Sequence, residues 1–239
     1  MKDKILIFIP VYNEEENVIL IVKDIFKKFK KNVDILFVED NSKDNTLKNI
    51  LTLKKKFKNI FLIKRKKKLG IGSAHKVGIS WAFKKKYKLL VTMDCDGTHN
   101  PFYIKKIISN LKKNKSDISI TNRFLKKGSL KDWGKWRIVL TTIRHLLIKK
   151  ILKINFDSSG AFRCYDLKKI KLNHILVAKD NGYSFFWESI YKLNNLNYRI
   201  TEIPIKLPGR LTGSSKMQIS DILRAFFYLI KVSTDKNKF

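Results

Sequence analysis

The chain of 239 residues contains little cysteine and no long apolar run. Its two cysteines, Cys95 and Cys164, are too few for a disulfide framework and lack the spacing of a zinc site. No stretch of about 18 consecutive apolar residues occurs, so no transmembrane helix is expected. No basic segment followed by an apolar run and a cleavage site opens the sequence, so no signal peptide is expected either. Together these absences predict a protein of the reducing cytoplasm.

Acidic residues are scarce beside basic ones, at 20 against 52, and the formal net charge is +32. The lysines fall in short scattered runs, such as Lys54–Lys56 and Lys66–Lys68, which is typical of solvated helix ends. No zinc finger, aromatic RNA-binding pattern or other nucleic-acid module accompanies them, so no nucleic-acid partner is predicted. The charge does favour anionic surfaces, of which phospholipid headgroups are one candidate.

In the first half of the chain, apolar segments alternate with polar-faced helical segments. This alternation predicts an α/β fold with a mostly parallel sheet and helices on both faces. The predicted strands are Ile5–Pro10, Val33–Val38, Ile60–Ile63, Leu89–Met93 and Ile118–Thr121, and the predicted helices lie near 14–30, 44–57, 73–86 and 101–113. Ligands bind such sheets beyond the carboxyl ends of the strands, so functional residues are expected there.

Two carboxylates, Asp94 and Asp96, follow the predicted strand Leu89–Met93. Hard oxygen ligands suit Mg²⁺ or Mn²⁺, which usually take their remaining ligands from substrate phosphates and water. The pair therefore predicts a clamp for a divalent cation that also holds a diphosphate. The alternative is that the two aspartates cap the helix that begins near Pro101.

Polar clusters also follow the first two predicted strands. Tyr12 and Glu14 lie after the first, where acidic residues equally suit the N-terminus of the next helix. Glu39 and Asp40 leave the second strand together, and a carboxylate at that point can accept hydrogen bonds from a nucleotide base or ribose. Residues 41–44 suit a turn and a helix cap as well, so this segment leaves both interpretations open.

Three glycines, Gly70, Gly72 and Gly78, follow the third strand but lack the G-x-G-x-x-G spacing of a dinucleotide-binding loop. A dinucleotide cofactor is therefore not predicted. The segment is better interpreted as a loop that packs closely near a helix N-terminus.

Eight motifs in chain order resemble those of the family 2 glycosyltransferases of the GT-A fold, and most of all the dolichyl-phosphate (polyprenyl-phosphate) mannosyltransferase branch. They are P-x-YNE-x-EN at 10–17, VEDNS-x-D-x-T at 38–46, LGIGSAH at 69–75, MDCDGTHNP at 93–101, NRF at 122–124, W-x-x-x-R ending at Arg137, SSGAFRCYD at 158–166 and EIPIKLPGRLTGSSKM at 202–217. The resemblance implies a GT-A (Rossmann-like) catalytic domain over 1–217 and a C-terminal amphipathic helix with a basic tail over 218–239.

The resemblance also implies roles for individual residues. Residues that match nucleotide-sugar-binding positions are Pro10, Tyr12, Glu14, Val38, Asp40, Asp94, Cys95 and Lys216. The implied metal ligands are Asp94, Asp96 and Thr98, the implied catalytic residues are Asp96 and Arg123, and the implied acceptor-phosphate residues are Arg137, Thr141 and Arg210. Glu188 matches an acidic position whose alternative role is a structural hydrogen bond. Thr98 stands where relatives often carry Ser or Gln.

The implied reaction is inverting transfer of a hexose, mannose from GDP-mannose, to a polyprenyl or dolichyl phosphate, with Mg²⁺ or Mn²⁺ as cofactor. A phosphomonoester has a second pKa of ~6, so this acceptor is anionic near neutral pH and needs little or no general base. The alternative is a family 2 enzyme that uses UDP-glucose, UDP-GlcNAc or a saccharide hydroxyl acceptor in cell-surface polysaccharide synthesis. A hydroxyl would require a base, with Asp96 or Glu188 as candidates. A non-catalytic basic protein is the third hypothesis.

Two amphipathic segments could hold the protein at a bilayer surface. Within Trp133–Ile154, apolar residues are expected on one side at positions 136, 139, 140, 143, 147, 151 and 154. Near the C-terminus, Ile219, Ile222, Leu223, Phe226, Phe227 and Ile230 repeat at helical spacing. Basic helices that carry Trp or Phe are typical of interfacial anchors, whereas the alternative is packing on the domain core. The protein is therefore expected to lie peripherally on the cytoplasmic face of a membrane, where a membrane-anchoring partner could assist it.

Overall fold

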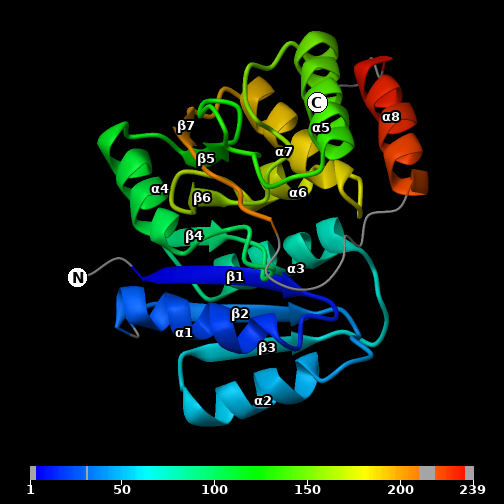
Figure 1. Ribbon diagram of the computed structural model, residues 1–239. Coiled ribbons are helices and arrows are strands. Elements are labelled where there is room, and N and C mark those ends of the chain that lie inside the picture. The colour runs from blue at the N-terminus through cyan, green and yellow to red at the C-terminus, as the bar shows by residue number, and fades with distance from the viewer. Residues whose placement is uncertain (1–3, 31, 210–218, 235–239) are drawn as a thin grey trace.

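The computed structural model describes residues 4–30, 32–209 and 219–234, and in these ranges seven strands form one sheet of order β3-β2-β1-β4-β6-β5-β7. The strands are β1 (Ile5–Val11), β2 (Asp34–Glu39), β3 (Ile60–Lys64), β4 (Leu89–Thr92), β5 (Ile118–Asn122), β6 (Arg163–Asp166) and β7 (Ile200–Pro204). Strand β6 runs antiparallel to both β4 and β5, and the other neighbouring strands are parallel. The predicted mostly parallel sheet is confirmed (Figure 1).

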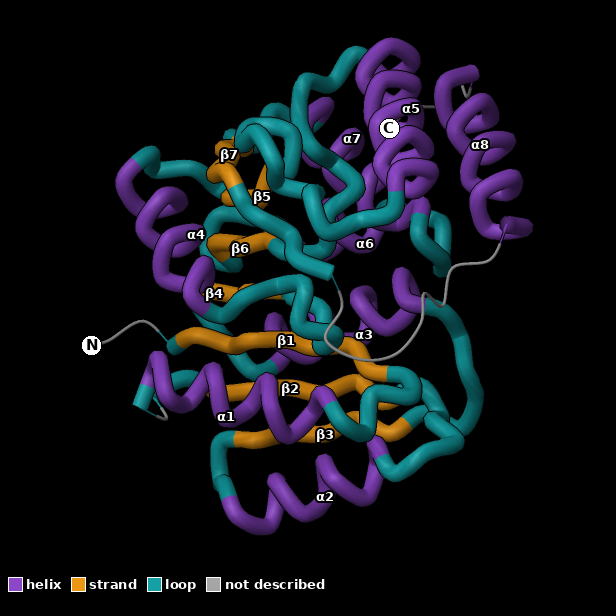
Figure 2. Tube along the Cα trace, viewed as in Figure 1, coloured by secondary structure: helices purple, strands orange, loops and turns teal. Residues whose placement is uncertain are grey.

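Helices cover both faces of this sheet, as predicted (Figure 2). They are α1 (Asn17–Phe29), α2 (Thr46–Lys56), α3 (Ile71–Lys84), α4 (Phe102–Lys113), α5 (Lys135–Leu152), α6 (Leu172–Leu176), α7 (Ser184–Asn195) and α8 (Ile219–Thr234). Because side chains alternate along a strand, Ile7 and Ile9 of β1 pack with α1 and α4, while Leu6 and Phe8 pack with α3 and α7. Strand β1 is thus buried on both faces, as its unbroken apolar run ILIFIPV requires.

Strand β6 begins with a buried arginine whose hydrogen bonds join three segments. The guanidinium of Arg163 donates to the backbone oxygens of Gly160 at 2.8 Å, Ser158 at 2.7 Å and Phe186 at 2.8 Å. It also donates to the hydroxyls of Tyr165 at 3.2 Å and Ser189 at 2.9 Å. These five bonds match the five N–H donors of a guanidinium. Arg163 therefore holds the segment before β6 against helix α7.

His75 of α3 lies fully inside the core, under strand β1. Its ring contacts the rings of Phe8 at 5.0 Å and Phe186 at 4.9 Å between centroids, and that of Phe185 at 5.6 Å. Burial lowers the pKa of His75 from 6.5 to about 3, and the positive charge of nearby Arg163 acts in the same direction. The histidine is thus a neutral core residue at physiological pH.

This burial predicts a loss of stability in acid. The unfolded chain binds a proton at His75 below pH 6.5, whereas the folded protein resists it down to about pH 3. Between these values, each unit of falling pH should remove about 1.4 kcal/mol of unfolding free energy through this group. Urea unfolding at pH 7.5, 6, 5 and 4 for wild type and His75→Phe measures the difference. Equal pH slopes for the two proteins would contradict it.

Candidate active site

The loops that follow β1 and β2 are joined by hydrogen bonds between the two motifs that the sequence places there. The backbone N–H of Asn13 donates to Ser42 Oγ at 2.9 Å, and that of Lys43 donates to Asn13 Oδ1 at 2.9 Å. The N–H of Glu14 donates to Thr46 Oγ1 at 2.7 Å. The polar residues of the second motif thus hold the first loop in place at the carboxyl edge of the sheet.

Acidic residues do lie at the N-terminus of helix α1, as the alternative interpretation predicted. The helix begins at Asn17 and its N-cap residue is Glu16, which makes no side-chain capping hydrogen bond. Glu14 Oε2 instead accepts the side-chain N–H of Asn17 at 2.7 Å. Glu15 Oε2 accepts both the backbone and the side-chain N–H of Asn45 at 2.9 Å, which adds to the junction with the second loop.

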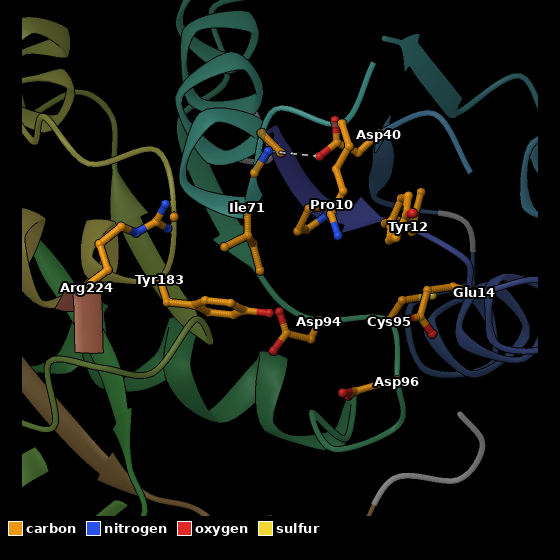
Figure 3. A pocket seen from close by; sticks show the side chains of 15 residues that line it. Pro10, Tyr12, Glu14, Asp40, Ile71, Asp94, Cys95, Asp96, Tyr183 and Arg224 are labelled. Carbon is orange, nitrogen blue, oxygen red and sulfur yellow. Dashed lines mark hydrogen bonds between the residues drawn. The ribbon is translucent and has the colours of Figure 1, made fainter. Parts of the chain in front are cut away.

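Asp40 lies at the end of β2 with its carboxylate held from several sides. It accepts the backbone N–H groups of Leu69 at 3.0 Å and Gly70 at 3.2 Å, and it pairs with buried Arg65 at 3.3 Å. Neighbouring Glu39 is turned inward instead, and its Oε1 accepts the N–H of Ser42. Asp40 is therefore the carboxylate of this pair that faces the pocket (Figure 3).

The glycine loop packs closely at the start of α3, as predicted. Gly70 has φ +93°, a conformation that residues with a side chain rarely adopt. A Cβ on Gly72 would lie 2.7 Å from the backbone oxygen of Gly182. The loop between β3 and α3 thus lies directly against the segment before α7, and both border the pocket.

Asp94 and Asp96 follow β4, and hydrogen bonds to Thr98 and His99 hold this loop. Asp96 Oδ1 accepts the backbone N–H of Thr98 at 3.1 Å and its hydroxyl at 2.6 Å. The backbone N–H of Asp94 donates to His99 Nδ1 at 2.8 Å. The first N–H of α4, from Phe102, is taken by the Asn100 side chain at 2.8 Å, so an asparagine caps this helix where the alternative interpretation placed the aspartates.

One pocket brings together most residues that the resemblance assigns to the donor (Figure 3). It is lined by Pro10, Val11, Tyr12, Glu14, Asp40, Lys68, Gly70, Ile71, Ala74, Asp94, Cys95, Asp96, Gly182, Tyr183 and Arg224. Val38 lies instead within β2 with its side chain fully buried in the core. Lys216 lies outside the described residues.

Three polar pocket residues, Lys68, Tyr183 and Arg224, were given no role from the sequence. The Lys68 ammonium lies 4.1 Å from the centre of the Tyr12 ring, within cation–π distance. Tyr183 precedes α7 and its hydroxyl points toward Asp94, while Arg224 comes from α8 (Figure 3). The last two are far from the donor motifs in sequence, and only the packing of α7 against α3 and of α8 against α7 reveals them.

The donor set of this pocket fits a divalent cation. Asp94 and Asp96 offer hard carboxylate oxygens from one short loop, the type that Mg²⁺ and Mn²⁺ prefer. Among the described residues, no group of three or more His, Cys, Asp or Glu residues is placed to hold a metal ion. Two carboxylates therefore suit an ion that completes its shell from a diphosphate and water. Thr98 orients Asp96 through its hydroxyl, and its role as a ligand stays a prediction.

A second group of polar residues lies after strand β5. Arg123 donates from Nε to Asp157 Oδ2 at 2.7 Å and from its backbone N–H to the same oxygen at 3.1 Å. Burial alone would raise the pKa of Asp157, but the Arg123 guanidinium and its hydrogen bonds outweigh this and lower it. Glu202 of β7 accepts the backbone N–H of Asp157 at 2.8 Å. The Arg123 side chain is thus fixed by an ionised carboxylate that is itself held in place.

The order of strands in the sheet sets the distance between the two aspartates and Arg123. Asp94 and Asp96 follow β4, whereas Arg123 follows β5, and β6 lies between these strands. Two strand spacings of ~4.8 Å separate the strands by roughly 10 Å. The intervening segment is secured to both neighbours, because Thr92 donates to Ala161 at 2.5 Å and Thr121 donates to Phe162 at 3.2 Å.

Helix α5 continues this second group. Arg137 stacks on Trp133, with its Cζ 3.7 Å from the ring centre, and Thr141 is buried one turn further along. The positions i and i+4 place both residues on one side of the helix. The third predicted acceptor-phosphate residue, Arg210, lies outside the described residues.

The opposite side of α5 is apolar and exposed. Its exposed residues are Trp136, Val139, Leu140, Ile143 and Leu146. Leu147 and Ile151 pack against the core and Ile154 is buried, so their predicted place on the exposed side is wrong. The helix ends at Leu152 with Lys153 in the left-handed conformation, and this turns Ile154 inward.

Helix α8 packs beside α5 (Figure 1). Its Leu229 is buried in the core, and Tyr228 contacts the Trp187 ring at 5.7 Å. Leu223, Phe226, Phe227 and Ile230 are exposed. The two neighbouring helices therefore both present apolar side chains to solvent. No helix in the described ranges is long and apolar enough to cross a membrane.

Glu188 does not reach the pocket, so its candidacy as a general base is wrong. It is fully buried in α7, where it accepts the backbone N–H groups of Lys179 at 2.9 Å and Asp180 at 3.0 Å. Lys192, one turn along the helix, lies 3.7 Å from its carboxylate. Glu188 therefore has the structural role that was its alternative.

A mostly parallel sheet with a pocket at its carboxyl edge and paired aspartates beside it is the arrangement of the GT-A fold. Residues 6–171 match the family model for glycosyl transferase family 2, and the chain belongs to that family.

Curated relatives and solved structures agree with this assignment. The chain is 29% identical to polyprenol monophosphomannose synthase of Mycolicibacterium smegmatis, over 93% of this chain and 84% of the relative. It is 27% identical to undecaprenyl-phosphate mannosyltransferase of Micrococcus luteus, over 90% and 87%. It also resembles the fold of glucosyl-3-phosphoglycerate synthase from Mycobacterium tuberculosis, crystallised with Mn²⁺, UDP-glucose and phosphoglyceric acid. For that structure the TM-score is 0.69 at 13% identity, covering 96% of this chain and 79% of the other.

Proposed function

We propose that this glycosyltransferase transfers mannose from GDP-mannose to a polyprenyl phosphate with inversion at the anomeric carbon. Two relatives that match along most of the chain carry names with this acceptor class and this sugar. A phosphate oxygen of the acceptor forms a bond to the anomeric carbon as the bond to the diphosphate breaks. The electron pair leaves with the nucleoside diphosphate.

The observation that carries the proposal is the two-sided character of helix α5. Thr141 is buried, and Arg137 acts on Arg144 together with Arg123 and Asp157, while Trp136 and Ile143 are exposed. A polyprenyl phosphate has the same two-part chemistry, an anionic headgroup on an apolar chain. The helix can therefore bind the phosphate on one side while its other side lies in the acyl region of a membrane.

The donor occupies the pocket after β1, β2 and β4 in this proposal. Asp40 accepts hydrogen bonds from the nucleoside, and the diphosphate lies over Asp94 and Asp96. A Mg²⁺ or Mn²⁺ ion held there would supply positive charge to the leaving diphosphate. Lys68 and Arg224 line the same pocket and add positive charge to it. Lys216 completes the predicted donor contacts.

The acceptor is bound and oriented by arginines rather than activated by a base. Planar guanidinium groups such as those of Arg123 and Arg137 bind phosphate oxygens through paired hydrogen bonds. The commitment of Glu188 to backbone N–H groups removes one base that a hydroxyl acceptor would need. Positioning of an acceptor that is already ionised then becomes the main demand on the site.

A radiolabelled transfer assay tests the proposal. Purified protein is given GDP-mannose, UDP-glucose or UDP-GlcNAc with undecaprenyl phosphate in detergent, with Mg²⁺, with Mn²⁺ or with EDTA. We expect metal-dependent label in the lipid phase from GDP-mannose, and none from undecaprenol, which lacks the phosphate. Transfer from a UDP-sugar alone would overturn the donor assignment. Label on undecaprenol or on saccharides alone would overturn the acceptor.

Membrane binding through α5 is a separate expected outcome, because Trp136 is 69% exposed and Ile143 is 48% exposed. Removing both from the bilayer should cost about 3 kcal/mol, so Trp136→Glu/Ile143→Glu should bind anionic liposomes about 100-fold more weakly. Liposome sedimentation measures this. Leu51→Glu on α2, 44% exposed at the far end of the molecule, is the control (Figure 1). Equal liposome binding by the double variant and by Leu51→Glu would contradict a membrane-binding role for α5.

A further inference from the structure

Arg144 lies on the same side of α5 as the two predicted phosphate residues. Arg137, Thr141 and Arg144 stand at i, i+4 and i+7, a spacing that forms one stripe along a helix. No motif singled out Arg144. Its Nη2 donates to Ser159 Oγ at 3.3 Å, and Ser159 in turn donates to Asp157 Oδ1 at 3.3 Å. Arg144 is thus connected to the carboxylate that holds Arg123.

The guanidinium of Arg144 is not fully satisfied by the protein. Its Nε is buried and has no hydrogen-bond partner within the described ranges. Buried N–H groups are nearly always bonded, and an exception calls for a partner that is absent. A phosphate oxygen has the acceptor chemistry that such a donor requires.

The charges around Arg144 point to an anion as well. Burial and the positive charges of Arg123 and Arg137 together lower the pKa of Arg144 from 12.5 to about 10, against the attraction of Asp157. Asp157 already binds Arg123 at 2.7 Å. Three guanidinium groups thus act on one another beside Asp157, and Glu202 adjoins Asp157. A phosphomonoester dianion would add negative charge to this cluster.

Glu202 is a further acid that adjoins Asp157, and burial raises its pKa. His145 stacks on Phe124, with ring centroids 4.1 Å apart. Burial lowers the pKa of His145, and the charges of Arg123, Lys149 and Arg144 lower it as well, although Asp157 opposes them. In the described part of the chain, Asp157 is thus the single carboxylate that acts on both Arg144 and His145.

We propose that Arg144 is a further phosphate-binding arginine of the acceptor subsite and that it selects a phosphomonoester dianion over singly charged or neutral acceptors. The inference rests on the proposed lipid-phosphate function and extends it, because a further charge would not be needed for a hydroxyl. Loss of Arg144 should weaken binding of a prenyl phosphate and leave donor binding unchanged.

Calorimetric titration of geranyl phosphate into the full chain, with GDP and Mg²⁺ present, tests this inference without turnover. The variants are Arg144→Gln, Arg144→Lys and Arg137→Gln, and Lys150→Gln is the control, since Lys150 is an exposed lysine of the same helix. We expect about 10-fold weaker binding for Arg144→Gln, partial recovery for Arg144→Lys, and wild-type affinity for the control. GDP affinity should stay the same in all four variants.

Two results would overturn the inference: wild-type affinity for geranyl phosphate in Arg144→Gln while Arg137→Gln binds weakly, or no binding by the wild type. Circular dichroism shows whether Arg144→Gln folds, and Arg144→Lys, which keeps the charge, gives the comparison if it does not. The proposed function fails separately. The wild type could bind geranyl phosphate through Arg144 and yet transfer no sugar to undecaprenyl phosphate. That result would support the phosphate-binding site and contradict the proposed reaction.

Discussion

Asp96→Asn should lose about 10³-fold in turnover while it keeps the fold. The substitution removes the negative charge that would hold the cation beneath the leaving diphosphate, and loss of one such electrostatic contact costs 10²–10³-fold or more. Asparagine retains an oxygen at the position that accepts two hydrogen bonds from Thr98. The loop should therefore stay in place. Initial rates at saturating donor and acceptor, across a range of Mg²⁺ and Mn²⁺ concentrations, measure the loss.

Asp24→Asn is the matched control, because Asp24 is an exposed aspartate on α1. It should keep the wild-type rate and the wild-type dependence on metal. Thermal unfolding of both variants should lie close to that of the wild type. A wild-type rate in Asp96→Asn would contradict the assignment of a metal site to this loop.

Arg163→Met should reduce the unfolding free energy by about 3–5 kcal/mol, the largest stability change expected for a single substitution here. Methionine fills part of the volume but donates no hydrogen bond. The backbone oxygens of Ser158, Gly160 and Phe186 would lose a buried donor, as would two hydroxyls. For a chain of this size the melting temperature should fall by about 10 °C.

Arg199→Met is the control, since Arg199 is an exposed arginine before β7. It should melt within about 2 °C of wild type, because exposed substitutions change stability little. Arg163→Met should also weaken acceptor use below its melting temperature, because the segment it holds carries Asp157. A melting temperature equal to that of Arg199→Met would show that Arg163 is dispensable for stability.

The strands that the sequence predicted are those with continuous apolar runs. Strands β1, β2 and β4 are buried on both faces, and this burial produces runs that local patterns detect. Strand β6 was missed because it opens on a charged residue, Arg163, whose burial depends on carbonyls from α7 and from the preceding segment. Strand β7 was missed because the polar residues Thr201 and Glu202 interrupt its apolar run.

In the candidate site, too, residues in local motifs were predicted and residues placed by distant packing were not. Asp94, Asp96 and Asp40 were predicted because each stands next to a strand end in a short motif. Tyr183 and Arg224 reach the same pocket only through the packing of distant helices, which no local pattern reports. The outward side of α5 was predicted in part, because periodicity alone did not locate the end of the helix at Leu152.

The antiparallel strand β6 separates two parts of the proposed site. Asp94 and Asp96 follow β4 on one side of it, and Arg123 follows β5 on the other side. In the proposed function, residues at the end of β5 could therefore change with the acceptor while those after β4 keep their contacts with the donor. Such an arrangement allows one scaffold to diversify toward new products in small evolutionary steps.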